Sequence, residues 1–135
     1  MWSKKKTVDE LLHAWQQHGD IRERIEAIRT IEATPARYAP LPDELHPSLR
    51  RALAHRGVEQ LYTHQREAFD YAMNKQSFTA VTPTASGKSY CYHLPVLQTI
   101  LTNKKARALY LFPTKALAQD QMTDVNALIE ASGED

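Results

Sequence analysis

The spacing of apolar residues predicts a helical segment at the start of the chain. Residues 7–18, TVDELLHAWQQH, carry apolar side chains at helical intervals, and four isoleucines continue at that spacing over residues 21–31. Stripes of this kind are typical of amphipathic helices that pack in a core or against a partner. Residues 1–33 are therefore expected to form an N-terminal helical extension.

Prolines mark the next part of the chain. Residues 34–47, TPARYAPLPDELHP, hold four of the seven prolines and predict an extended connector. Pro47 then stands at a helix-opening position and Gly57 at a C-terminal cap, which predicts a helix between them. A second helix is expected over THQREAFDYAMNK, with Thr63 as its N-cap.

Two short apolar runs, SFTAVTP and ARALYLFP, are rich in β-forming residues and predict buried strands. Each run is followed by a segment of helical length, and this alternation is typical of a parallel α/β sheet. Residues 48–135 are therefore expected to form one α/β unit with parallel strands and flanking helices. A chain of 135 residues can bury the core of one small domain.

Composition excludes several classes of protein. The 17 basic and 16 acidic residues give a net charge of +1, so any basic surface must be local. A single cysteine, Cys91, excludes an internal disulfide framework, and the six histidines show no paired metal-ligand spacing. No apolar run reaches membrane-spanning length and the N-terminus lacks a signal sequence, which predicts a cytoplasmic chain.

The stretch AVTPTASGKSYCYHLPV carries the clearest chemical signal. Gly-Lys-Ser alone is a weak signal, because about 5–10% of chains of this length would contain Gly-Lys followed by Ser or Thr by chance. Here an expected strand precedes it and an expected helix follows it. A P-loop needs that context, because its backbone N–H groups converge on a phosphate at a helix N-terminus. Thr82 departs from the pattern, in which the first residue is usually Gly or Ala. The alternative is a left-handed glycine turn beside a solvated lysine.

In P-loop geometry each residue of this stretch has a defined task. Backbone N–H groups of Ala85, Ser86, Gly87 and Lys88 face the phosphates, and the Lys88 ammonium reaches the β and γ groups. The Ser89 hydroxyl ligates Mg²⁺. The stretch thus predicts a site for a nucleotide, with ATP and Mg²⁺ as the expected ligands.

Two further stretches, LYTHQREAF upstream and LFPTKALAQDQ downstream, could be an ordinary helix start and a proline-terminated strand. In this order with TPTASGKS, they resemble the superfamily 2 DEAD/DEAH-box helicases. There a glutamine-containing motif precedes motif I, and motif Ia follows the second strand of a RecA-like domain. The resemblance runs from about residue 35 to the C-terminus, and YAPLPDELHPSLRRALAHRGVEQLYTHQREAF is similar to the bacterial YprA-type subgroup in particular.

The resemblance implies roles for two groups of residues. The implied ATP-binding residues are Leu61, Tyr62, Gln65, Thr84, Ala85, Ser86, Gly87, Lys88 and Ser89. Among them Gln65 contacts the adenine edge through its amide, with Leu61 and Tyr62 near the base. The implied nucleic-acid-binding residues are Pro113, Thr114, Lys115 and Gln119. These contact the sugar-phosphate backbone, so binding is expected to be independent of base sequence, and the subgroup favours DNA over RNA.

A motor of this family also needs a Walker B Asp-Glu pair and arginine fingers from a second RecA-like domain. The chain ends at ALIEASGED before either, so the sheet is expected to be incomplete, with no catalytic residue in this chain. The expected partners are nucleic acid and the rest of the motor, in cis or in trans. Two alternatives stay open: a non-catalytic nucleotide- or partner-binding fragment, and a P-loop kinase, which leaves LYTHQ and PTKALAQ without a role.

Overall fold

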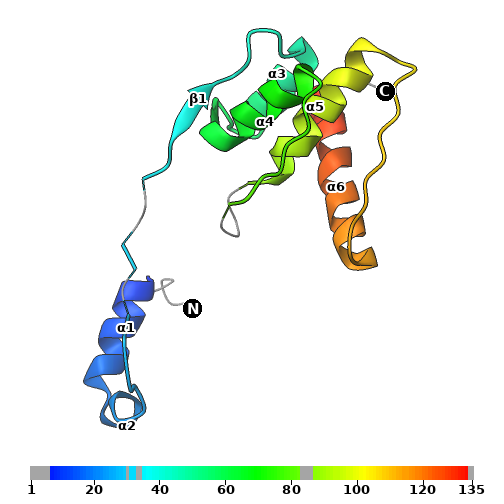
Figure 1. The fold of residues 1–135 in the computed structure, drawn as a ribbon. Helices are drawn as coiled ribbons and strands as arrows, with labels where there is room; N and C mark the ends of the chain where they lie inside the picture. Colours follow the sequence, from blue (N-terminus) through cyan, green and yellow to red (C-terminus); the bar gives the residue numbers. More distant parts are fainter. Residues whose placement is uncertain (1–6, 30, 33–34, 83–86, 134–135) are drawn as a thin grey trace. The chain divides into compact units, whose positions relative to one another are not determined.

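The structure is a computed structural model that describes residues 7–29, 31–32, 35–82 and 87–133 (Figure 1). The chain divides into two compact units, Met1–Pro35 and Ala36–Asp135. None of the helices in the described ranges combines the length and apolar character needed to cross a lipid bilayer.

The first unit contains helix α1 (Val8–Gln17) and the single turn α2 (Gly19–Arg22). Thr7 caps α1 with a capping box, in which its hydroxyl accepts from Glu10 N and the Glu10 carboxylate accepts from Thr7 N.

The prediction of a helix along the isoleucine stripe is wrong beyond α2. Residues 25–29 have no regular secondary structure, and neither α1 nor α2 contains a buried residue. Ile28 is 50% exposed. Short helices in water depend on tertiary packing of their apolar face, and β-branched isoleucine is a weaker helix former than leucine or alanine. Apolar spacing without burial does not sustain a helix here.

Among its described residues, the second unit contains a small antiparallel sheet and four helices. Strands β1 (Tyr38–Pro40) and β2 (Gln60–Tyr62) pair with Tyr38 opposite Tyr62. The helices are α3 (Pro47–His55), α4 (Thr63–Met73), α5 (Ser89–Thr102) and α6 (Lys115–Ser132).

Local sequence signals fix most helix ends. Pro47 is the first residue of α3, and Gly57 follows its C-cap with a left-handed φ of 71°, as predicted. Thr63 is the first residue of α4 rather than its N-cap, which is Tyr62. The cap lies one residue earlier because the Gln65 side chain accepts a hydrogen bond from Tyr62 N.

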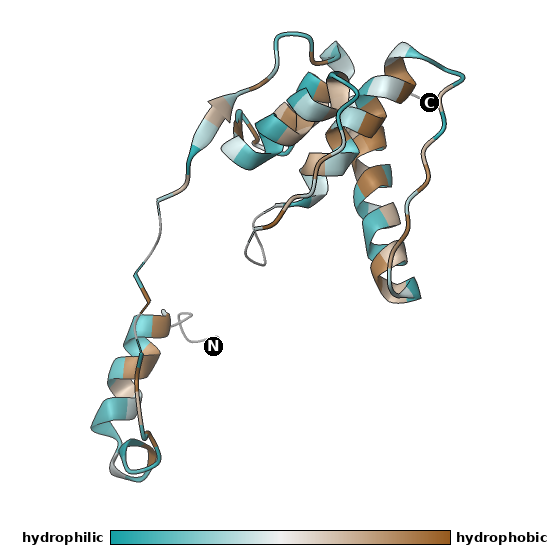
Figure 2. Ribbon diagram, in the orientation of Figure 1, coloured by the Kyte–Doolittle hydropathy of each residue, from teal (hydrophilic) through white to brown (hydrophobic). Residues whose placement is uncertain are grey.

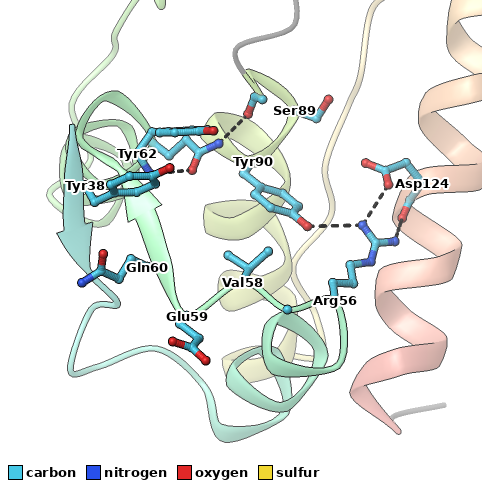
Figure 3. A pocket seen from close by; sticks show the side chains of 12 residues that line it. Tyr38, Arg56, Val58, Glu59, Gln60, Tyr62, Ser89, Tyr90 and Asp124 are labelled. Atoms are coloured by element: carbon cyan, nitrogen blue, oxygen red, sulfur yellow. Dashed lines mark hydrogen bonds and ion pairs between the residues drawn. The ribbon is translucent and has the colours of Figure 1, made fainter. Parts of the chain in front are cut away.

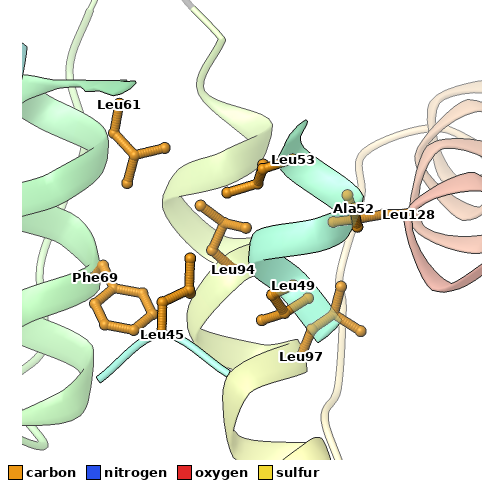
Figure 4. Close-up of a cluster of buried hydrophobic side chains, with 9 residues drawn as sticks. All are labelled: Leu45, Leu49, Ala52, Leu53, Leu61, Phe69, Leu94, Leu97 and Leu128. Atoms are coloured by element: carbon orange, nitrogen blue, oxygen red, sulfur yellow. The ribbon is translucent and has the colours of Figure 1, made fainter. Parts of the chain in front are cut away.

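The core of the second unit lies among its helices (Figure 4). Its buried apolar side chains are Leu45, Leu49, Ala52, Leu53, Leu61, Phe69, Leu94, Leu97 and Leu128. Helix α3 packs against both α5 and α6, and α4 packs against α5. Leu45 comes from the stretch predicted as a connector, so residues 36–47 are part of this unit and not a linker beside it.

The parallel sheet expected from the two apolar runs is not confirmed. Residues 77–82 and 106–112 are extended, but the ladder among the described residues joins β1 to β2 and is antiparallel. Val81, Leu109 and Leu111 are more than 80% exposed, at 87%, 82% and 83%. Figure 2 shows hydrophobic residues along the extended segment that leads into α6. A strand forms where a neighbouring strand accepts its backbone hydrogen bonds, and these segments have no such neighbour in the described ranges. Their parallel arrangement stays a prediction.

Candidate functional site

A pocket of about 520 Å³ lies between the small sheet, the start of α5 and α6 (Figure 3). Residues that line it include Tyr38, Arg56, Tyr62, Gln65, Gly87 and Ser89. The pocket therefore brings the predicted adenine-side residues of β2 and α4 together with the predicted phosphate-side residues at the start of α5.

Gln65 joins these two sides directly. Its side chain is buried, its Oε1 accepts from Tyr62 N at 2.9 Å, and its Nε2 donates to the Gly87 carbonyl oxygen at 2.8 Å. A glutamine amide has capacity for four hydrogen bonds, two as donor and two as acceptor. Gln65 thus holds Gly87 against β2, and Gln65 also lines the pocket.

Gly87 forms the left-handed glycine turn that the alternative interpretation of this stretch predicts. Gly87 has a left-handed φ of 71°, and a Cβ at this position would lie 2.6 Å from Gln65 Nε2. Ser89 is the first residue of α5, whose N-cap Lys88 makes no side-chain hydrogen bond to the first turn. The first N–H groups of a helix carry partial positive charge and favour an anion.

The Lys88 ammonium donates to the Thr82 carbonyl oxygen at 3.0 Å and so spans the base of the loop. The alternative of a solvated lysine does not describe this position, because the side chain is half-buried. Thr84, Ala85 and Ser86 lie outside the described residues. The described parts of this loop are Gly87, where a Cβ would contact the Gln65 amide and the Tyr62 ring, and the start of α5 that follows it.

Leu61 differs from its predicted place. It belongs to β2 and is fully buried in the hydrophobic core, and it does not line the pocket. Side chains alternate along a strand, so Leu61 faces the core while its neighbour Tyr62 faces the pocket.

Tyr38 is a pocket residue that the sequence analysis missed. Its ring stacks on that of Tyr62, with centroids 5.1 Å apart and planes 23° apart. A hydrogen bond with Tyr62 raises the pKa of the Tyr38 phenol. Tyr38 is 55% exposed, so the pair offers an open aromatic surface beside Gln65.

The opposite wall of the pocket contains an ion pair that the sequence analysis also missed. Arg56, the C-cap of α3, donates from Nη1 to Asp124 Oδ1 at 2.9 Å and from Nη2 to the Asp124 carbonyl oxygen at 3.1 Å. Nη1 also lies 3.4 Å from the hydroxyl of Tyr90, the residue after Ser89. Burial lowers the pKa of Arg56, but these hydrogen bonds outweigh it and the net pKa is raised.

The residues expected to contact nucleic acid lie together at the start of α6 and do not line the pocket. Thr114 is the N-cap, and its hydroxyl oxygen accepts from Leu117 N at 3.2 Å. Pro113, Lys115 and Gln119 are exposed around this helix end. The positive end of α6 and the Lys115 ammonium thus face solvent.

A profile of the DEAD/DEAH box helicase family matches residues 62–134, more than half of the chain. The chain belongs to the DEAD/DEAH box helicase family. This match confirms the family expected from the order of the three motifs.

Relatives of this DEAD/DEAH box helicase chain confirm the YprA-like subgroup. The uncharacterized ATP-dependent helicase YprA of Bacillus subtilis (strain 168) is 45% identical over 98% of the chain, or 17% of that protein. The ATP-dependent helicase hrq1 of Schizosaccharomyces pombe is 36% identical over 88% of the chain, or 12% of that protein.

A solved helicase structure shares the fold. The crystal structure of the DUF1998 helicase MrfA bound to DNA and AMPPNP matches with a TM-score of 0.80 at 43% identity, over 96% of this chain and 18% of that one. The fold of the chain is therefore that of a helicase domain. The chain spans less than a fifth of the length of these relatives.

Proposed function

We propose that this chain forms the ATP-binding part of an ATP-dependent DNA helicase or translocase. The observation that carries the proposal is the pocket in which Tyr62 and Gln65 meet Gly87 and Ser89. The match to MrfA, whose structure contains AMPPNP and DNA, supports the same assignment.

Different residues of the site contact the adenine, the phosphates and the Mg²⁺ ion. The adenine lies on the aromatic surface of Tyr38 and Tyr62, with the amide of Gln65 at its edge. The phosphates lie at the N-terminus of α5, where Lys88 exchanges its hydrogen bond to Thr82 for the β and γ groups. Ser89 supplies a hydroxyl ligand to Mg²⁺, and ATP supplies the free energy for movement.

The start of α6 provides the nucleic-acid contact. Backbone N–H groups there, the Thr114 hydroxyl and Lys115 bind phosphates of one strand, and Gln119 supports the loop from the next turn. These groups contact no base edge, so recognition is independent of sequence. DNA is favoured over RNA because MrfA is described with DNA.

Within this function, residues 77–82 and 106–112 are strands of a parallel RecA-like sheet, and their neighbours belong to the rest of the motor, in cis or in trans. Their exposed apolar side chains support this assignment, because such strands are normally buried on both faces. The second candidate is a non-catalytic nucleotide- or partner-binding fragment, which would need neither a Walker B pair nor arginine fingers. Family membership gives no support to a P-loop kinase.

Hydrolysis tests whether the catalytic groups lie within this chain. If the Walker B pair and arginine fingers must come from elsewhere, the chain alone hydrolyses ATP no faster than a Lys88→Ala variant, with or without DNA. Lys88-dependent turnover would show that the chain holds its own catalytic groups.

Nucleotide binding tests the proposal itself. Titration of the chain with Mg²⁺ and a fluorescent AMPPNP derivative is expected to show one site that unlabelled ATP displaces. Lys88→Ala removes a charged hydrogen-bond donor and weakens binding by about tenfold or more, while Lys104→Ala, an exposed lysine remote from the loop, leaves it unchanged. Equal affinity for both variants would overturn the proposal.

A further inference from the structure

Helix α6 is tied to the start of α5 by polar contacts at two successive turns. At the first, Asp124 holds Arg56, whose Nη1 also contacts the hydroxyl of Tyr90. Tyr90 follows Ser89 directly, so this contact lies at the phosphate side of the pocket. Asp124 therefore connects α6 to the residues expected to hold the nucleotide.

The second contact lies one turn earlier on α6. Gln121 Oε1 accepts from the Tyr92 hydroxyl at 2.6 Å and lies 3.1 Å from Nε2 of His93, which is almost fully buried. Because Oε1 is an acceptor, His93 carries its proton on Nε2, and Nδ1 is left to accept from the Tyr110 hydroxyl at 3.4 Å. These directional bonds fix α6 on α5 more closely than apolar packing alone.

The same helix carries the expected nucleic-acid contact at its N-terminal end. Lys115 and Asp124 are nine residues apart, which at about 1.5 Å per residue is about 14 Å along a continuous helix. A helix of this length moves as one body, so a displacement at Asp124 also displaces Thr114 and Lys115.

The triphosphate of a bound nucleotide provides the differential interaction that coupling requires. Its negative charge attracts Arg56 and repels Asp124, since both line the pocket that contains Gly87 and Ser89. A bound triphosphate therefore weakens the ion pair between Arg56 of α3 and Asp124 of α6.

We propose that Asp124 is a positioning residue that couples nucleotide binding in the pocket to nucleic-acid binding at the start of α6. The inference rests on the proposed function, because it needs both ligands to bind. It assigns Asp124 no contact with a reacting atom. Coupling between two sites is reciprocal, so each ligand changes the affinity of the other by the same factor.

The test measures that factor. The dissociation constant of Mg²⁺·AMPPNP is determined for the full 135-residue chain at low salt, without and with a saturating thymidine oligonucleotide. We expect a ratio of about fivefold or more, in the ordinary range of allosteric coupling. The ratio is expected to fall close to one in Asp124→Asn. A change in nucleotide affinity alone cancels in this ratio.

Two further variants keep the test decisive. Asp70→Asn is the matched control, because Asp70 pairs with Arg66 at 2.9 Å within α4 and neither residue lines the pocket. Gln121→Met breaks the second contact outside the pocket and is also expected to lower the ratio. It replaces Asp124→Asn if a thermal melt shows that the latter is unfolded.

The outcomes distinguish the role of Asp124 from the proposed function on which it rests. Retention of the ratio in Asp124→Asn and Gln121→Met, or its equal loss in Asp70→Asn, would overturn the role of Asp124. A ratio of one in the unmodified chain with both ligands bound would overturn the inference and leave the proposed function standing. Failure of AMPPNP or the oligonucleotide to bind would contradict the proposed function itself.

Discussion

The two candidate sites of this chain differ in how far their residues are buried and hydrogen-bonded to one another. On the nucleotide side, the buried Gln65 bonds to Tyr62 and Gly87, and the surrounding residues enclose a pocket of about 520 Å³. On the nucleic-acid side, Pro113, Lys115 and Gln119 are exposed around one helix end, whose cap is the Thr114 hydroxyl.

This difference separates what the chain organises by itself from what needs further contacts. Hydrogen bonds of the buried Gln65 side chain hold Tyr62 and Gly87 in place without a ligand, so binding at this candidate site would lose less side-chain entropy. A single helix end with one lysine offers few phosphate contacts, so its affinity stays close to that of non-specific binding. We therefore expect substitutions on the two sides to differ in size and in kind.

Gly87→Ala is expected to have the largest effect. The new Cβ would lie 2.6 Å from Gln65 Nε2, and the left-handed φ of 71° adds about 1–2 kcal/mol of strain. The matched control is Gly133→Ala, which has a φ of 70° and no heavy atom within 4 Å of its new Cβ. Both variants lose comparable backbone stability, but Gly87→Ala alone loses Mg²⁺·AMPPNP binding by tenfold or more, on the order of 1.4 kcal/mol. Equal nucleotide affinity in the two variants, measured by titration, would contradict a role of Gly87 in nucleotide binding.

Gln65→Leu is expected to lower the free energy of unfolding by about 1–3 kcal/mol, because it removes two hydrogen bonds of the buried Gln65 side chain, one from Tyr62 N and one to the Gly87 carbonyl oxygen. Urea denaturation measures the change. Gln76→Leu, at an exposed glutamine, should stay within about 0.5 kcal/mol of the unmodified chain. A small effect at Gln65 would mean that the two sides of the pocket are not joined through its amide.

His93 predicts a pH dependence of stability. Burial disfavours the imidazolium and lowers the pKa of His93 in the folded chain. The unfolded chain therefore binds the proton more readily, so stability is full above the ordinary pKa of about 6.5 and is lost as the pH falls below it. His93→Gln should flatten this loss between about pH 7.5 and pH 5 in urea titrations, while His55→Gln, at an exposed position, should not. An unchanged slope in His93→Gln would show that another group causes the loss.

The smallest effect is expected at the start of α6. One or two phosphate contacts predict a log-log salt slope of about −1 and single-strand affinity of about 10⁻⁴ M or weaker. Thr114→Ala with Lys115→Ala should abolish this binding in a low-salt titration, while Lys104→Ala with Lys105→Ala should leave it nearly unchanged. The reverse result would assign the attraction to the exposed basic turn before residues 106–112.

Local signals carried most of what the sequence predicted correctly. Pro47 and Gly57 act within their own turns, and the left-handed φ of Gly87 agrees with the glycine turn that was the alternative interpretation of its stretch. The helix predicted along the isoleucine stripe was wrong because helical spacing shows which side chains would share a helix face, but not whether another element packs against that face. The strands over residues 77–82 and 106–112 need neighbours, so their apolar character alone could not decide their structure.

Long-range pairs account for the site residues that were missed. Arg56 and Asp124 are 68 positions apart, and nothing in the sequence of α3 or α6 links them. Tyr38 reaches the pocket because a three-residue strand pairs with another of the same length, a pattern too short to predict from alternation. Leu61 was placed beside the base by resemblance, whereas strand alternation turns it into the core.

Chemical-shift mapping tests the central claim most directly, namely that Gln65 and the start of α5 form one nucleotide site within this chain. The isotope-labelled chain is titrated with Mg²⁺·AMPPNP, and the signals of Gly87 N–H, Ser89 N–H and the Gln65 side-chain amide are followed. We predict that all three shift together along one saturating curve, while the amides of residues 104–107 do not move. Shifts confined to the basic turn, or a Gln65 amide that stays unchanged while Gly87 responds, would contradict this account.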